Sequence, residues 1–65
     1  MANARDNITD TEKRRDHGGF YRHWLTWLLP SSTEPNRQWF RNPSDREEFA
    51  AIFRQLGAHI EQGES

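Results

Sequence analysis

Three histidines and a few serines are the side chains of this 65-residue sequence that could support metal binding or hydrolysis. His17 and His23 stand six residues apart with two glycines between them, and His59 lies far from both. This spacing matches neither a His-x3-His pair nor a Cys/His set, and the sequence has no cysteine. We therefore expect no metal and no cofactor.

A hydrolytic site would need a serine nucleophile beside a histidine base. The candidate nucleophiles are Ser31, Ser32 and Ser44, with His23 or His59 as the base. Ser44 already has a structural explanation as a helix N-cap, and so short a chain has little mass with which to build a water-excluding pocket. We expect no catalytic residues and no enzymatic activity.

Aromatic side chains and arginines carry the remaining binding chemistry. Residues 20–29 (FYRHWLTWLL) hold seven large apolar side chains. In a helix these would cover an arc of about 200°, with Arg22, His23 and Thr26 on an arc of about 100°. The rest of the chain has too little apolar surface to cover so wide a face, and this mismatch indicates a partner.

We expect part of this aromatic face to dock in a groove of a larger protein or on a second copy of the chain. Helix-in-groove binding uses anchors spaced as these are, and Trp and Arg are enriched at binding hot spots. No small-molecule substrate is expected. The predicted partner-binding residues are Arg22, Trp24, Trp27, Leu28, Trp39 and Phe40.

Two other functions remain open. Arginines interleave with aromatic residues, a mixture typical of proteins that bind single-stranded nucleic acid, but the net charge of −1 makes nucleic acid an unlikely ligand. The tryptophans could also anchor an interfacial helix at a membrane surface, although its polar arc carries a single arginine. The nucleic-acid alternative would use Arg14, Arg15, Arg22, Arg37 and Arg41 with Tyr21, Trp24, Trp39 and Phe40.

We predict that the elements that position these residues form an all-α fold, a small two-helix hairpin. We predict a first helix over residues 19–29, ended by Pro30, and a short helical turn over residues 35–41. A second helix over residues 44–62 follows a capping-box pattern at Ser44–Glu47. Its apolar stripe is formed by Phe49, Ile52, Phe53, Leu56 and Ile60, with a bend expected at Gly57.

The remaining segments set the predicted domain organisation. Residues 1–18 read as a flexible arm, disordered or weakly helical, because they contain few apolar side chains. Within this arm, Thr9 to Glu12 spells a capping box that could start a short helix. Residues 19–62 form the predicted helical domain, and residues 63–65 a frayed tail.

Composition limits the class of protein. No segment has the apolar length of a secretory signal or a membrane-spanning helix, so we expect a cytoplasmic, intracellular protein. The arginine-rich composition and small size suggest a bacterial or phage product. The sequence thus predicts a small regulatory or accessory protein, such as an adaptor, an inhibitor or a subunit of a larger assembly, which binds protein through an aromatic amphipathic helix.

Overall fold

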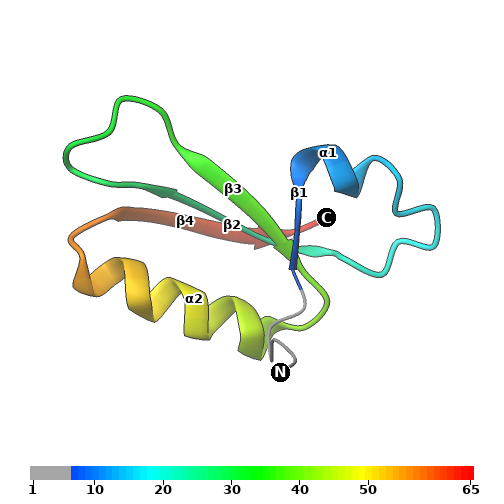
Figure 1. Ribbon diagram of the computed structural model, residues 1–65. Coiled ribbons are helices and arrows are strands. Elements are labelled where there is room, and N and C mark those ends of the chain that lie inside the picture. The colour runs from blue at the N-terminus through cyan, green and yellow to red at the C-terminus, as the bar shows by residue number, and fades with distance from the viewer. Residues whose placement is uncertain (1–6) are drawn as a thin grey trace, which may run out of the picture.

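The computed structural model describes residues 7–65 as a four-stranded sheet with one long helix (Figure 1). The strands pair in the order β1-β3-β2-β4, and every neighbouring pair is antiparallel. Helix α2 packs on one face of the sheet, and the short α1 lies on the side of the other face, near β1 (Figure 1). The elements in chain order are β1 (Asn7–Thr9), α1 (Asp10–Lys13), β2 (His23–Leu28), β3 (Asn36–Phe40), α2 (Pro43–Gln55) and β4 (His59–Glu64).

The predicted all-α hairpin is wrong. Strand β2 replaces the helix expected over residues 19–29, and β3 replaces the helical turn expected over residues 35–41. The reason lies in β2, whose two faces both carry large apolar side chains. Such a strand lacks the alternation of apolar and polar residues that marks a half-buried strand, and at helical spacing it produces the wide apolar arc noted above.

The core lies between the inner face of the sheet and α2. Leu25, Trp27, Phe40 and Ala50 are buried, and Leu25, Phe40 and Ala50 have no exposed surface. The Trp27 ring stacks on Phe53 with centroids 4.3 Å apart and an interplanar angle of 15°. Trp27 therefore belongs to the core, where it joins β2 to the helix.

Helix α2 is the predicted element that the structure retains in part. It begins at Pro43, one residue before the predicted start, because Asn42 rather than Ser44 caps it: the Asp45 backbone N–H donates to Asn42 Oδ1 at 2.9 Å. Pro43 occupies the first turn, where its missing N–H is not needed.

The same helix ends much earlier than predicted, at Gln55 instead of residue 62. Gly57 adopts φ +83°, its N–H donates to the Arg54 carbonyl at 3.0 Å, and the Ala58 N–H donates to the Phe53 carbonyl at 3.0 Å. These two bonds form a Schellman motif, which closes the helix and reverses the chain. Ile60, predicted as the last residue of the helical stripe, instead lies in β4 and packs against the core.

The start of the described chain is ordered into the fold. The capping box predicted at Thr9 is present: the Glu12 N–H donates to Thr9 Oγ1 at 3.3 Å, and the Thr9 N–H donates to Glu12 Oε1 at 2.9 Å. Strand β1 pairs with the second half of β3. The expectation of a flexible N-terminal arm is therefore wrong for the part that forms β1 and α1. Residues 1–6 of that arm lie outside the described residues. The division into units at residues 18 and 62 remains a prediction.

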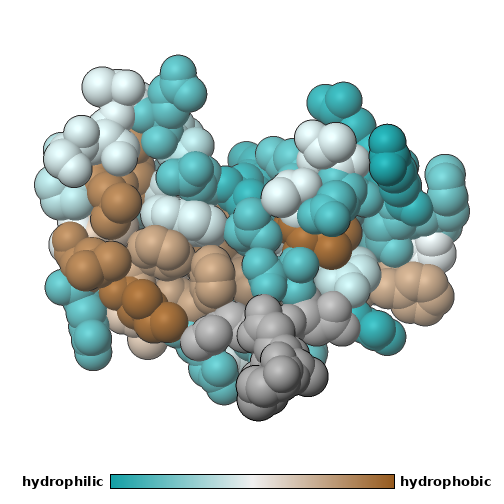
Figure 2. Space-filling model, viewed as in Figure 1, coloured by the Kyte–Doolittle hydropathy of each residue, from teal (hydrophilic) through white to brown (hydrophobic). Residues whose placement is uncertain are grey.

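Two exposed apolar side chains mark the outer flank of α2. Ile52 is 45% exposed and Leu56 is 58% exposed. In Figure 2 brown surface gathers over the C-terminal half of α2, at the lower left. This patch is well separated from the tryptophans that lie on the opposite face of the sheet.

Candidate functional site: the open face of the sheet

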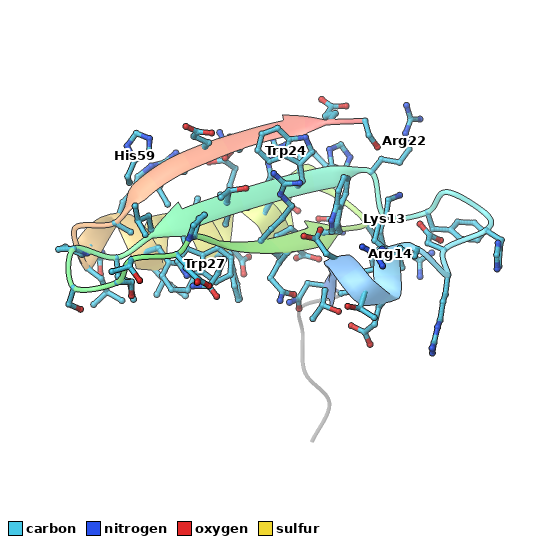
Figure 3. The ribbon with its side chains drawn as sticks, turned by 90° about the horizontal axis from the view of Figure 1, so that it is seen from above. Lys13, Arg14, Arg22, Trp24, Trp27 and His59 are labelled. Atoms are coloured by element: carbon cyan, nitrogen blue, oxygen red, sulfur yellow. The ribbon has the colours of Figure 1, made fainter. Side chains whose placement is uncertain are left out.

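The face of the sheet turned away from α2 carries the site candidates, and within residues 7–65 only α1 covers part of it (Figure 3). Side chains alternate between the two faces of a strand, so the neighbours of the buried Leu25 and Trp27 in β2 point to this open face. The strand register then groups the open-face residues in rows. One row is Ile8, Trp39, Trp24 and Gly63; the next is Arg37, Thr26 and Glu61; and Leu28 pairs with His59 in a third.

Trp24 lies directly on Gly63 of β4. A Cβ atom at Gly63 would come within 2.7 Å of Trp24 Cζ2, closer than real contacts allow. Since the φ angle of Gly63 is not positive, the glycine is needed here for space and not for an unusual backbone conformation. The absence of a side chain at Gly63 thus sets the position of the indole.

Trp39, the cross-strand neighbour of Trp24, is held by α1. Its Nε1–H donates to Asp10 Oδ1, and Lys13 Nζ lies 4.9 Å from the ring centroid. The capping box fixes α1 and therefore both of these contacts. Trp39 is partly buried as a result.

The loop between α1 and β2 is organised around Asp16. The Tyr21 backbone N–H donates to Asp16 Oδ2 at 2.8 Å, and Lys13 Nζ lies 3.4 Å from the same oxygen. The Tyr21 hydrogen bond is the main reason why the pKa of the Asp16 carboxyl lies below its ordinary value of 3.8. Asp16 thus remains ionised at neutral pH and draws the Lys13 ammonium toward the loop.

Arg37 is the cation at the centre of the open face. Its Nε–H donates to Thr26 Oγ1 at 3.1 Å, and its Cζ lies 5.2 Å from the centroid of the Trp24 ring. It is exposed, and it forms no ion pair with any residue from 7 to 65. The guanidinium is therefore positioned by two neighbours without being neutralised.

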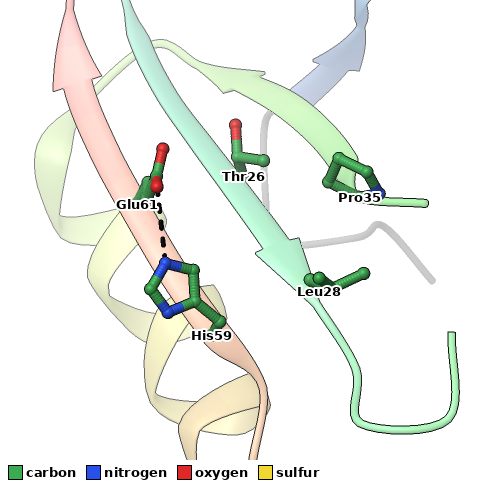
Figure 4. A pocket seen from close by; sticks show the side chains of 5 residues that line it. All are labelled: Thr26, Leu28, Pro35, His59 and Glu61. Carbon is green, nitrogen blue, oxygen red and sulfur yellow. Dashed lines mark hydrogen bonds and ion pairs between the residues drawn. The ribbon is translucent and has the colours of Figure 1, made fainter. Parts of the chain in front are cut away.

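A pocket of about 170 Å³ opens at the end of β2 (Figure 4), and Thr26, which accepts the hydrogen bond from Arg37, is one of the residues that line it. Its lining is mostly apolar, and at one side His59 Nε2 lies 3.3 Å from Glu61 Oε2. The lining residues are Thr26, Leu28, Pro35, His59 and Glu61.

Arg22 lies at the opposite end of the open face, where β2 begins (Figure 3). Its Nε and Nη2 donate to the Ser65 carbonyl at 3.1 and 3.0 Å, while the Ser65 N–H donates back to the Arg22 carbonyl at 2.9 Å. Arg22 thus extends the ladder between β2 and β4 by one pair.

The structure separates the six predicted partner-binding residues into two groups. Arg22, Trp24, Leu28 and Trp39 share the open face, where the two tryptophans are cross-strand neighbours. Trp27 and Phe40 lie on the inner face, with 8% and 0% of their surface exposed. No observation tests a binding role for any of the six, but burial leaves the last two little surface for a partner.

Six residues of the three rows on the open face were not among the predicted partner-binding residues: Ile8, Thr26, Arg37, His59, Glu61 and Gly63. Arg37 was considered only for nucleic acid. The signal that could have found it is the strand register, which places it directly opposite Thr26. That register exists only if β2 and β3 are strands. It could not be seen while residues 19–29 and 35–41 were predicted to be helical.

Other kinds of site find no support in the described chain. No group of three or more His, Cys, Asp or Glu side chains within residues 7–65 is placed to hold a metal ion. Neither of the two helices in this range is long and apolar enough to cross a membrane.

No protein family model, curated protein or solved structure matches this chain.

Proposed function

We propose that this chain is a small non-catalytic protein-binding module, an adaptor, inhibitor or accessory subunit, whose docking surface is the open face of the sheet. The observation that supports this most is the pair Trp24 and Trp39, set side by side on a face that no other element of residues 7–65 covers except at α1. Trp and Arg dominate hot spots in protein interfaces, and here Arg22 and Arg37 flank the tryptophans. The predicted docking by an aromatic helix is withdrawn, since residues 23–28 form a strand.

The positions of the cations favour a protein over nucleic acid. Base stacking needs an accessible aromatic face, but Arg37 lies over Trp24 and Lys13 lies over Trp39. The Trp24 ring also rests on Gly63. The Arg37 guanidinium is therefore better placed to meet a carboxylate of a partner than the rings are to stack with bases.

Affinity capture from the source cells, with stoichiometry measured by mass spectrometry, tests this proposal. The wild-type chain is compared with Arg37→Gln on the open face and with Leu56→Ser on the outer flank of α2. We expect a stoichiometric protein partner that Arg37→Gln weakens by about tenfold or more and Leu56→Ser leaves unchanged, because a charged hot-spot contact is worth roughly 1.4 kcal/mol or more. Failure to capture a partner, or the reverse dependence on the two variants, would contradict the proposal.

Single-stranded nucleic acid is the second candidate, because two indoles and several cations share one open sheet face. Binding of an oligo(dT) probe is measured by anisotropy at about 50 and 200 mM salt. A log–log salt slope steeper than about −2, together with micromolar affinity, would place nucleic acid first. Weak binding with a flat slope would leave protein docking as the better account.

The interfacial-membrane alternative depended on the same aromatic helix. With residues 23–28 in a strand between β3 and β4, no amphipathic helix remains at that position. Nothing observed in the described chain favours that function.

A further inference from the structure

The guanidinium of Arg37 is prepared for an anionic ligand. Thr26 takes the Nε–H, and the Trp24 ring holds the group from one side. The two Nη groups keep their donors, and no carboxylate of residues 7–65 pairs with them. A guanidinium fixed in this way loses less conformational freedom on binding, and its planar fork suits a carboxylate.

The pocket next to Arg37 suits one apolar side chain. A volume of about 170 Å³ accommodates a side chain of the size of leucine, and Leu28 and Pro35 supply apolar walls (Figure 4). Thr26 lies between the two features, since it both lines the pocket and accepts the bond from Arg37. A ligand that fills the pocket therefore passes within reach of the guanidinium.

The spacing of the two features matches an extended peptide. The row of Arg37 and the row of Leu28 lie two residues apart along the strands, which corresponds to about 7 Å. Side chains two residues apart in an extended peptide point to the same side with the same spacing. One side chain of such a peptide would enter the pocket, and the side chain two residues away would reach Arg37.

The charges of the face favour a peptide carboxylate on the side of β3. Arg37 is on β3, whereas Glu61 is on β4, with β2 between them; two strand spacings separate their backbones by about 10 Å. Glu61 is near His59 and the pocket, so a peptide carboxylate is attracted to the β3 side and repelled from the β4 side.

We propose that the open face recognises an extended peptide segment of a partner protein that carries a leucine-like apolar side chain and, two residues away, a carboxylate. The apolar side chain fills the pocket formed by Thr26, Leu28, Pro35, His59 and Glu61. The carboxylate accepts hydrogen bonds from the Nη groups of Arg37. This inference rests on the proposed function and specifies the chemistry of its partner.

The test is an NMR titration of the full chain with terminally blocked pentapeptides. The probes are Ser-Leu-Ser-Glu-Ser and its reversed order Ser-Glu-Ser-Leu-Ser, with matched controls in which Gln or Lys replaces Glu, or Ser replaces Leu. We expect one of the two orders to shift the amide signals of Thr26 and Leu28 and the indole signal of Trp24, with a Kd of about 1 mM or below. Replacing either Glu or Leu in that peptide should weaken binding at least fivefold.

The variant Arg37→Gln, with its fold checked by the same spectra, should bind the Glu and Gln peptides equally. The wild-type comparison of the Glu and Gln peptides needs no variant and stands even if Arg37→Gln does not fold. Equal affinity of the wild-type chain for these two peptides, tighter binding of the Lys peptide, or no saturable shift by about 5 mM would overturn the inference. An oligo(dT) probe that causes the same shifts at lower concentration would overturn it as well.

The peptide titration tests this inference and the capture experiment tests the proposed function, so their outcomes can be told apart. A captured partner that depends on Arg37, combined with no peptide binding, overturns this inference and leaves the proposed function in place. Peptide binding that depends on Glu, on Leu and on Arg37 supports this inference even where the capture experiment recovers no partner.

Discussion

The two faces of strand β2 carry similar residues but differ in burial. Leu25 and Trp27 point toward α2 and are buried, whereas Trp24 and Leu28 point away from it and remain partly exposed. The inner pair gains aromatic neighbours from α2, including the stacked ring of Phe53. In the outer pair, Trp24 contacts the guanidinium of Arg37 and the backbone at Gly63 instead. Apolar side chains in this strand therefore form the core on one side and the proposed docking surface on the other.

The largest expected effect compares two leucines of the same strand. Leu25→Ala should lower the free energy of unfolding by about 2–5 kcal/mol, because it empties a fully buried site. Leu28→Ala should cost about 1 kcal/mol or less, since its site is partly exposed on the open face. Urea denaturation followed by tryptophan fluorescence measures both. Equal losses would show that the two faces of β2 contribute alike to stability.

A smaller effect concerns the glycine under Trp24. Gly63→Ala should destabilise the fold by about 1–3 kcal/mol, because the new methyl group overlaps the indole. The same substitution in a Trp24→Ala background should cost much less, since the overlapping ring is gone. A double-mutant cycle from thermal unfolding provides the comparison. An additive result would mean that the indole does not depend on Gly63.

The turn between α2 and β4 links the inner face to the edge of the sheet. Gly57→Ala should cost about 1 kcal/mol, because a residue with a Cβ atom is strained at φ +83°. Gly57→Asn is the matched control and should cost less, because asparagine tolerates this conformation better. Unchanged midpoints for Gly57→Ala in chemical denaturation would contradict the Schellman ending of the helix.

The smallest effect lies in the loop that precedes the open face. The folded-state pKa of Asp16 is lower than its ordinary value, so the carboxylate stabilises the folded state above about pH 5 and loses this contribution as the pH falls through its folded-state pKa. The Tm of Asp16→Asn should therefore be lower than that of the wild type at pH 7. The difference should shrink by pH 3 and below. A difference that grows on acidification would contradict the hydrogen bond from the Tyr21 N–H.

Local signals in the sequence were sufficient where short-range hydrogen bonds decide the structure. The capping box at Thr9 predicts α1, and the apolar positions Phe49 and Phe53 predict the core of α2. Gly57 was expected to bend the helix and in fact ends it, because its left-handed conformation completes the two bonds of the Schellman motif. Each of these features depends on residues within about one turn of one another.

The candidate site depended on contacts that a local pattern does not contain. The types of Trp24, Arg37 and Trp39 are visible in the sequence, but their proximity comes from the pairing of β2 with β3.

The sequence by itself determined the capping box at Thr9, the positions of the apolar residues and the lack of any thiol. Only the tertiary structure decided that residues 23–28 form a central strand, that Trp27 is core and that Trp24 lies on the open face. The physical reason is that the backbone groups of a strand form hydrogen bonds with segments distant in the sequence. The two faces of β2 therefore become different only because α2 covers one of them.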